Sequence, residues 1–347
     1  MKHREDASAR DRIISAIEEN DVFVILTHVS PDGDSIGSLV ALWRVLVHRG
    51  KQCFALFPGD MPPEYLFLLG GEDLPRSLPS GQKWDVVVLL DIPSISRLPL
   101  SLNRQIPPCK ELINIDHHES NDIRGTINWV DPSASSVGEM LCHLLEHARY
   151  DVSSEVATAL YTAILTDTGS FRFPNTTSSS LRAAARLVTY GVNPARVAQH
   201  VYGSHSLRKF QLLGLALATL QTCFSGKVAY MWVTRKMLDE VGVSPVEADG
   251  FINFPREIKG VEVAILFKQE GPEGEVKVSL RSKRRNVVVS RVAEMFHGGG
   301  HPLAAGCTLS GSAETVQELI LKAIAEELEQ AGMAASASSL SGSPSKG

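Results

Sequence analysis

The stretch VFVILTHVSPDGDSIGSLVALWRVLVH, residues 22–48, decides the fold class. Its beginning, Val22–Thr27, is an apolar run rich in β-branched residues, which favours a buried strand. The turn Pro-Asp-Gly-Asp at 31–34 then leads into a helical pattern from Ser35 to His48. A strand followed directly by a helix is the unit from which parallel sheets are built.

The remainder of the first half repeats this alternation. Strand patterns occur at Cys53–Leu56, Asp85–Leu90 and Leu112–Ile115, and long helical patterns at Ser135–Ala148 and Ser154–Thr166. The sequence therefore predicts an α/β fold with a parallel sheet and flanking helices. In such sheets a ligand lies beyond the carboxyl ends of the strands.

The second half has a different pattern. Residues Ser179–Gln221 indicate successive helices that connect to a second, smaller α/β domain. We expect strands and helices of this second domain at Lys227–Val233, Val261–Phe267, Glu275–Leu280, Val287–Phe296 and Glu314–Gln330. The predicted organisation is a first domain at 1–190, a helical linker at 191–222, a smaller C-terminal domain at 223–332 and a disordered tail at 333–347.

Bulk properties exclude several classes of protein. Hydrophobic residues make up 44% of the chain, enough for sizeable cores, and the formal net charge of -5 argues against a grip on long nucleic acid. The five cysteines are scattered and form no C-x-x-C pair, so a reducing compartment fits better than a disulfide framework. The charged start of the chain and the short apolar runs predict a cytoplasmic protein without a membrane helix.

Two clusters of polar residues stand at the ends of the first and third predicted strands. His28, Asp32 and Asp34 surround the Pro-Asp-Gly turn, where a single carboxylate would suffice to cap the helix. Asp91 directly follows the apolar run Val86–Leu90. It is either an exposed residue at a strand end or a carboxylate that bridges two metal ions. Carboxylates and imidazoles together suit Mn(II), Mg(II) or Zn(II).

Two further clusters follow later elements. Asp116, His117 and His118 come directly after a predicted strand, and chance placement of three ligand-type side chains there is the less favoured interpretation. Asp167 ends a helical pattern just before Gly169, a residue suited to a left-handed helix end that would also hold Asp167 in place.

Together the four clusters supply the ligands for two metal ions. Two cations about 3.5–4 Å apart generate a hydroxide and clamp the attacking and leaving oxygens at phosphorus. The six candidate ligands are His28, Asp32, Asp34, Asp91, His117 and Asp167.

A fifth candidate site lies far away in the sequence, at Gly298-Gly299-Gly300-His301. Consecutive glycines allow a close approach between backbone N–H groups and an anion, although a surface loop would also tolerate them. Upstream, Arg281 and Ser282 end a predicted strand, where the guanidinium either binds a second phosphate or is a solvated charge.

These motifs resemble the DHH phosphoesterases. The pattern His28-x-x-x-Asp32-x-Asp34, then Leu90-Asp91, Asp116-His117-His118 and Thr166-Asp167-x-Gly169 is similar to the four motifs of that family. The Gly298–His301 block resembles the signature of the DHH-associated domain that follows in one branch. The match spans roughly Asp21 to Gln330, and the set of motifs is highly specific in this order and spacing.

The resemblance implies roles for individual residues. His28, Asp32 and Asp91 would hold one metal ion. Asp34, Asp91, His117 and Asp167 would hold the other, so that Asp91 bridges the two. Asp116 would support the site and His118 would contact the scissile phosphate. A terminal phosphate or base of the substrate would be bound in the second domain by Arg281, Ser282, Gly299, Gly300 and His301.

The resemblance also implies an activity. The chain is similar to the nanoRNase and pAp-phosphatase group, which trims oligoribonucleotides of a few residues to mononucleotides and removes the 3′-phosphate of 3′-phosphoadenosine 5′-phosphate (pAp). We therefore expect two Mn(II) per subunit, with Mg(II) or Co(II) as substitutes, a homodimer, and short RNA and small nucleotides as partners. The alternatives are a cyclic or linear dinucleotide phosphodiesterase (c-di-AMP in the cyclic case), an inorganic pyrophosphatase, and a catalytically inactive metal- or RNA-binding module.

Overall fold

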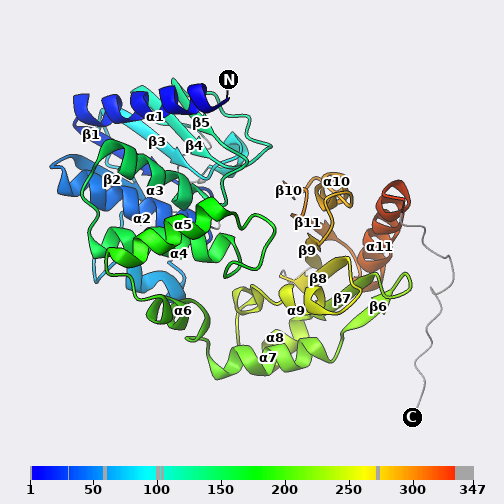
Figure 1. Cartoon of the computed structure of the whole chain (residues 1–347). Helices are drawn as coiled ribbons and strands as arrows, with labels where there is room; N and C mark the ends of the chain where they lie inside the picture. Colours follow the sequence, from blue (N-terminus) through cyan, green and yellow to red (C-terminus); the bar gives the residue numbers. More distant parts are fainter. Residues whose placement is uncertain are drawn as a thin grey trace, which may run out of the picture. The chain divides into compact units, whose positions relative to one another are not determined.

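The chain forms two compact units, Met1–Ser204 and His205–Gly347. The structure is a computed structural model that describes residues 2–29, 31–57, 61–98, 102, 105–270 and 274–332. The tail that we predict to be disordered, 333–347, lies outside the described residues. In Figure 1 the first unit runs from blue to green and the second from green to red. Each unit has its own sheet and its own buried core.

The first unit contains a five-stranded sheet in the order β2-β1-β3-β4-β5. All neighbouring strands are parallel, which confirms the predicted fold class. The strand β5, with the sequence INWV, is too short for its pattern to predict it. The strands are β1 (Val22–Leu26), β2 (Gln52–Leu56), β3 (Trp84–Leu90), β4 (Cys109–Asp116) and β5 (Ile127–Val130).

Helices cover one face of this sheet. Phe23 and Val88 of that face are buried in one cluster with Ile13 of α1, Leu39 of α2 and Leu141 of α3. Figure 1 shows these helices beside the sheet. The bounds are α1 (Lys2–Glu19), α2 (Gly33–His48), α3 (Val137–Ala148), α4 (Ser154–Asp167), α5 (Ser178–Thr189) and α6 (Pro194–Tyr202), with short 3₁₀ helices η1 (Pro63–Leu68) and η2 (Ile95–Arg97).

The opposite face of the first sheet packs against irregular segments. Val24, Val87 and Leu89 form a second buried cluster that includes Leu98 and Ile123. Both faces are therefore covered, which explains why the strand β3 reads as an almost continuous apolar run.

The second unit contains a six-stranded mixed sheet in the order β10-β11-β9-β8-β7-β6. Only β7 and β8 pair in parallel. The sequence predicts β7, β8 and β9, but not β6, β10 and β11, which are very short or rich in Ala and Gly. The strands are β6 (Gln221–Cys223), β7 (Val228–Val233), β8 (Val263–Gln269), β9 (Glu275–Ser282), β10 (Gly299–His301) and β11 (Ala304–Ser310).

Helices lie on both faces of this second sheet. Val278 and Leu280 of β9 face a core shared with α10 and α11. On the other face, Ala264 of β8 packs with Phe251 and Ile252, which precede α9. The bounds are α7 (Leu207–Leu217), α8 (Arg235–Val241), η4 (Pro245–Ala248), α9 (Asn253–Glu257), α10 (Val289–Glu294) and α11 (Ala313–Gln330).

The predicted linker, 191–222, corresponds to α6 at the end of the first unit and to α7 and β6 at the start of the second. Within the described part of the chain, no helix is both long enough and apolar enough to cross a membrane.

Candidate metal centre and anion site

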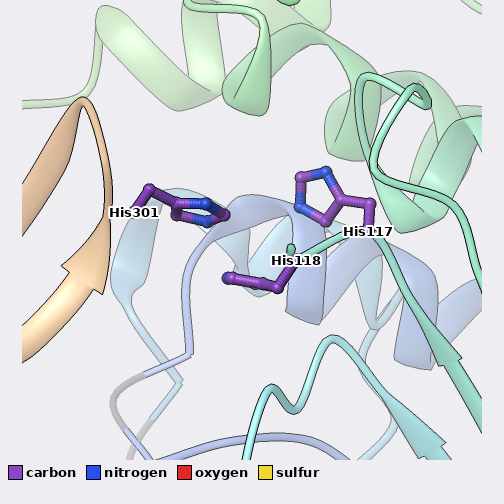
Figure 2. Close-up of side chains that lie close together, drawn as sticks. All are labelled: His117, His118 and His301. Carbon is purple, nitrogen blue, oxygen red and sulfur yellow. The ribbon is translucent and has the colours of Figure 1, made fainter. Parts of the chain in front are cut away.

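The predicted metal ligands gather at the carboxyl end of the parallel sheet. The strand β1 pairs with β2 on one side and β3 on the other, so the strand order reverses there, and ligands of such sheets bind beyond the strand ends at this position. His28 follows β1, and Asp91 directly follows β3. Asp116 ends β4, and Figure 2 shows the imidazoles of His117 and His118, which come next in the chain.

The first group of potential ligands contains His28, Asp32 and Asp91, whose ligand atoms all lie within 4.8 Å of one another. The Nε2 atom of His28 is 3.5 Å from Oδ2 of Asp91. The Nδ1 atom lies 2.7 Å from the carbonyl oxygen of Val29. With Nδ1–H donating to that carbonyl, the lone pair of Nε2 faces Asp91, as a metal ligand requires.

The second group contains Asp34, Asp91 and His117. The Nε2 atom of His117 is 3.6 Å from Oδ1 of Asp91 and 3.9 Å from a carboxylate oxygen of Asp34 and of Asp167. Asp91 therefore belongs to both groups. The structure brings all six predicted ligands together, and their role as ligands stays a prediction.

A third group joins Asp116 and His118 to Asp91. The Nδ1 atom of His118 is 2.6 Å from Oδ1 of Asp116 and 3.3 Å from Oδ1 of Asp91. Asp116 also accepts hydrogen bonds from the backbone N–H groups of His117 and His118. Asp116 thus fixes the orientation of His118 through Nδ1 of that ring.

The start of α2 and the start of α3 together hold two of the carboxylates. Asp32 is the N-cap of α2, and its Oδ1 accepts hydrogen bonds from the N–H groups of Asp34 and Ser35. Asp34 accepts hydrogen bonds from the N–H groups of Val137 and Gly138 at the start of α3. The carboxylate that caps α2 is therefore Asp32, whereas Asp34 points across to the neighbouring helix.

Asp91 has an unusual backbone conformation. Its φ angle is 61°, in the left-handed region that few residues other than glycine adopt. The residue is 2% exposed, and Oδ2 accepts a hydrogen bond of 2.6 Å from Ser35. Its other oxygen, Oδ1, is buried without a hydrogen-bond partner among the described residues. Such strain and such an unsatisfied atom are typical of functional sites.

The electrostatics of the cluster favour a bound cation. Burial, followed by the charge of Asp91, raises the pKa of Asp34 well above its usual value. Burial also raises the pKa of Asp167 to about 7, although the charge of His117 acts in the opposite direction. Burial opposes protonation of His117, but the charges of Asp167 and Asp91 outweigh it and raise its pKa to about 9.

The residues present fit a pair of divalent metal ions. Carboxylates this crowded and this buried cannot all ionise without compensating positive charge. The donor set of carboxylate oxygens and imidazole nitrogens is that of Mn(II), Mg(II) and Zn(II) sites. The unsatisfied Oδ1 of Asp91, which is 3.6 Å from Nε2 of His117 and 3.3 Å from Nδ1 of His118, is an atom that a metal ion would satisfy.

Sequence reasoning missed two asparagines that support the cluster. Asn121 donates hydrogen bonds to Oδ2 of Asp116 and to the carbonyl oxygen of Ile92. Asn175 donates hydrogen bonds to Oδ2 and the backbone oxygen of Asp167. Both lie in loops, where asparagine is common, so nothing in one sequence distinguishes them from ordinary turn residues.

Sequence reasoning also missed Arg97 as a residue of the site. Its Nη2 atom lies 3.1 Å from Nδ1 of His28 and 3.4 Å from the carbonyl oxygen of Val29. It comes from η2, a 3₁₀ turn that follows β3 at a distance of several residues.

The residues that we predict to bind substrate in the second domain lie on β9 and β10 of the second unit. Arg281 and Ser282 end β9, while Gly299, Gly300 and His301 form β10; Figure 2 also draws His301. The strand β11 lies between β9 and β10 in the sheet.

These residues differ in how open they are to a ligand. The hydroxyl of Ser282 donates to the carbonyl oxygen of Arg284 and accepts from the N–H of Arg284, so it stabilises the following turn. A Cβ on Gly300, whose φ is 142°, would lie 2.5 Å from the carbonyl oxygen of Ala304. A Cβ on Gly299 would meet nothing within 4 Å. The space over the backbone is therefore open at Gly299.

Comparison with known protein families agrees with the motifs. Residues 22–164 match the DHH family, N-terminal domain, and residues 225–330 match the DHHA1 domain. The chain is 36% identical over 313 residues to the bifunctional oligoribonuclease and PAP phosphatase NrnA of Thermus thermophilus, a match that covers 89% of this chain and 90% of that protein. The resemblance inferred from the motifs is confirmed.

Solved structures show the same fold. The crystal structure of an exopolyphosphatase-related protein from Bacteroides fragilis has a TM-score of 0.86 and 25% identity, and the match covers 94% of this chain and 98% of that one. RecJ of Thermus thermophilus, solved in complex with Mn²⁺, has a TM-score of 0.50 and 15% identity over 94% of this chain and 55% of that one. At that identity the likeness to RecJ concerns the fold alone.

Proposed function

Because the chain belongs to the DHH family, we propose that it is a metal-dependent phosphoesterase that degrades oligoribonucleotides of about 2–5 nucleotides to mononucleotides and removes the 3′-phosphate of pAp. The observation that carries this proposal is the buried carboxylate of Asp91. It belongs to three groups of potential ligands and keeps one oxygen without a hydrogen bond among the described residues. The similarity to the oligoribonuclease and PAP phosphatase of Thermus thermophilus along most of the chain supports the choice of substrate.

The proposed metal site contains two cations per subunit. His28, Asp32 and Asp91 hold one cation, and Asp34, Asp91, His117 and Asp167 hold the other. When bound, such cations supply Lewis acidity that activates water and neutralises the charge of a phosphoryl group. We assign Mn(II) as the metal, with Mg(II) or Co(II) as substitutes. The Mn²⁺ ion in the structure of RecJ, which shares the fold, supports this assignment.

The chain's own residues orient the substrate and move the proton. Asp116 holds His118 through Nδ1, so Nε2 of His118 faces the scissile phosphate. In the hydrolysis of a phosphodiester, the oxygen of water adds to phosphorus and the bond to the leaving ribose oxygen breaks. That leaving oxygen takes a proton from Nε2 of His118. Nε2 is within hydrogen-bonding reach of the leaving oxygen only when the ring keeps this orientation.

The domain boundaries and the terminal-phosphate site form a further part of the proposal. We assign catalysis to residues 1–190, a linker to 191–222 and substrate binding to 223–332. The matches to the two families lie within the first and the third of these ranges. In the third range, Arg281, Ser282, Gly299, Gly300 and His301 would bind the end of the substrate.

The remaining proposals concern location and assembly. We infer a cytoplasmic protein, because all five cysteines are free, as is usual in a reducing compartment. We also infer a homodimer, for which the support is the family resemblance alone. Light scattering of the purified chain tests the dimer, and metal analysis of the same sample tests the two Mn(II) per subunit.

Hydrolysis by the purified chain with Mn(II) tests the function. The substrates are a dinucleotide RNA, pAp, linear and cyclic diadenylate, pyrophosphate and a long single strand. The variant Asp91→Asn should abolish turnover, whereas Asp122→Asn, an exposed aspartate that follows β4, should retain it. Preference for the dinucleotide and pAp is expected. Preference for cyclic diadenylate or pyrophosphate would replace the substrate class, and no turnover of any substrate would refute the enzymatic proposal.

A further inference from the structure

The η2 turn after β3 holds Arg97 against the segment that follows β1. The backbone N–H of Val29 donates a hydrogen bond of 2.9 Å to the carbonyl oxygen of Arg97. The side chain extends along the same segment, so that Nη2 is 3.1 Å from Nδ1 of His28 and 3.4 Å from the carbonyl oxygen of Val29. The backbone contact therefore fixes Arg97 beside a proposed metal ligand independently of what the guanidinium binds.

The Nδ1 atom of His28 lies between a hydrogen-bond acceptor and a hydrogen-bond donor. The carbonyl oxygen of Val29, at 2.7 Å, is an acceptor and requires a proton on Nδ1. The guanidinium of Arg97 has donors only and requires a lone pair on Nδ1. One ring nitrogen satisfies only one of these two neighbours at a time.

The other ring nitrogen decides which neighbour of His28 is satisfied. Nε2 is 2.7 Å from Oγ of Ser35, whose hydroxyl donates to Oδ2 of Asp91. Because Ser35 uses its single proton on Asp91, its Oγ accepts from Nε2–H, and Nδ1 is left as an acceptor for Arg97. When Nε2 binds the proposed metal ion instead, the neutral imidazole carries its proton on Nδ1 and donates to Val29. Arg97 then loses its hydrogen bond to His28.

No carboxylate replaces His28 as a partner of Arg97. Within the part of the chain that the structure describes, no ion pair includes Arg97, whereas Arg44 of the same unit pairs with Glu72. The remaining acceptor, the carbonyl oxygen of Val29 at 3.4 Å, is the one that Nδ1–H approaches to 2.7 Å. Arg97 is also exposed, so such a long contact contributes little to the fold. A cation without a described anionic partner is thus separated from the metal centre by one imidazole ring.

We propose that Arg97 binds a non-bridging oxygen of the substrate phosphate at the metal centre once His28 holds a metal ion. This inference rests on the proposed function and adds Arg97 to it as a substrate-binding residue. A guanidinium and a phosphate oxygen form a charge-assisted hydrogen bond, which is roughly twice as strong as a neutral one. Because the metal ion ends the hydrogen bond between Arg97 and His28, the contact with phosphate depends on the metal ion.

Calorimetry with inorganic phosphate on the full chain tests this dependence, because phosphate binds without turnover. Its dissociation constant is measured with saturating Mn(II) and in EDTA, and the unaltered chain should bind it more tightly with Mn(II). Arg97→Met should weaken phosphate binding with Mn(II) roughly tenfold or more, the usual value of a hydrogen bond to a charged group, and leave binding in EDTA unchanged. Arg97→Lys, which keeps the charge, should recover part of the affinity.

The affinity for Mn(II) itself separates substrate binding from support of His28. Arg97→Met should bind Mn(II) at least as tightly as the unaltered chain, because the guanidinium favours the form of His28 that carries its proton on Nε2, and that proton must leave when metal binds. An arginine that only holds His28 in place would weaken Mn(II) binding when it is removed. Calorimetric titration of Mn(II) without phosphate provides this readout, and kcat/KM for a dinucleotide should fall roughly tenfold or more in the same variant.

Arg124→Met is the matched control. Arg124 is an exposed arginine of the same unit whose guanidinium donates to the carbonyl oxygen of Ile123, and its loss should leave every dissociation constant unchanged. Unaltered thermal unfolding of Arg97→Met shows that this variant is folded. The proposal is overturned if the unaltered chain shows no Mn(II)-dependent binding of phosphate, if Arg97→Met binds phosphate equally well with Mn(II), or if Arg97→Met binds Mn(II) more weakly.

The outcome is separable from that of the proposed function. Turnover of a dinucleotide with unchanged phosphate binding in Arg97→Met would refute the role of Arg97 and leave the phosphoesterase assignment in place. Phosphate binding that depends on both Mn(II) and Arg97, without turnover of any substrate, would refute the assignment and retain the contact.

Discussion

Replacing Asn121 by alanine should destabilise the first unit far more than a surface asparagine does. Asn121 links three parts of the site, because it donates hydrogen bonds to Asp116 and to the carbonyl oxygen of Ile92 and exchanges hydrogen bonds with Asn114. It also accepts one from the N–H of Ile123. The variant Asn121→Ala removes all of these contacts in one step.

The size of the effect follows from burial. Asp116 and Asn114 are both 0% exposed, so neither can replace the lost partner with bulk water. Each buried polar group left without a partner costs about 1–3 kcal/mol, and a charged one costs more. We therefore expect a loss of about 4 kcal/mol in the free energy of unfolding. For a unit of this size each kcal/mol shifts the Tm by about 2–4 °C, so the expected fall is about 8–16 °C.

Tryptophan fluorescence during thermal unfolding reports the first unit, because three of the four tryptophans, Trp43, Trp84 and Trp129, belong to it. The control is Asn128→Ala. Asn128 is exposed and exchanges two hydrogen bonds with Gly125. Its loss should cost less than about 1 kcal/mol, since water replaces the partner. Equal shifts in Tm for the two variants would refute the reasoning that burial, and not the count of hydrogen bonds, sets the cost.

Three other predictions follow from the structure. Gly300→Ala should destabilise the second unit by about 2 kcal/mol or more in chemical denaturation, because its Cβ would meet the carbonyl oxygen of Ala304. Gly299→Ala, whose Cβ would meet nothing within 4 Å, should change stability by less than about 0.5 kcal/mol. Burial opposes ionisation of Glu139, but hydrogen bonds from His143 and Ser135 outweigh it and lower the pKa to about 2. Since the folded pKa is below the unfolded value of 4.5, this carboxylate stabilises the fold above pH 4.5 and loses that effect as pH falls toward 2. The unaltered chain should therefore be more stable than Glu139→Gln by about 1–3 kcal/mol at pH 7. Urea titrations should show that this difference shrinks between pH 4.5 and pH 2. Mn(II) at about a hundred times its dissociation constant should add about 2.7 kcal/mol to the free energy of unfolding, and Asp91→Asn, which suits a left-handed backbone, should abolish this gain in thermal unfolding with and without the metal ion.

The sequence predicted β1, β2, β3 and β4 of the first sheet and the adjacent strands β7, β8 and β9 of the second, and it missed β5, β6, β10 and β11. The strand β3 is buried on both faces, so its residues Trp84–Leu90 carry a strong apolar signal. The strand β10, by contrast, consists of Gly299–His301 and is held by its pairing with β11, which lies a few residues further along the chain. The helix α1 was missed because its charged surface hides the few apolar residues, such as Ile13 and Ile17, that are buried against the sheet.

The residues of the site also divide into those that the sequence predicts and those that it does not. Each predicted ligand follows an element whose pattern is clear, so the spacing along the sequence places it at the correct end of the sheet. The supporting residues lack such a pattern, because their function depends on tertiary contacts. Asn175 acts on Asp167 from a loop eight residues later, and Val137 and Gly138 act on Asp34 through backbone N–H groups more than a hundred residues away. Any residue type provides a backbone N–H, so no sequence motif could have revealed these contacts.

The net charge of -5, from which we predict that the chain does not grip long nucleic acid, conceals two local imbalances of opposite sign. In the first unit, Asp34, Asp91 and Asp167 lie close together, and burial raises the pKa of Asp34 and Asp167, so a bound cation would stabilise their ionised forms. In the second unit, burial and the positive charge of Arg256 lower the pKa of Arg281 to about 10. Such imbalances cost stability in an empty protein, and the cost is offset when ligands of the opposite charge bind. The metal ions that we propose for the first unit would offset its imbalance, and a phosphate ester, which is an anion, is the kind of ligand that such ions bind.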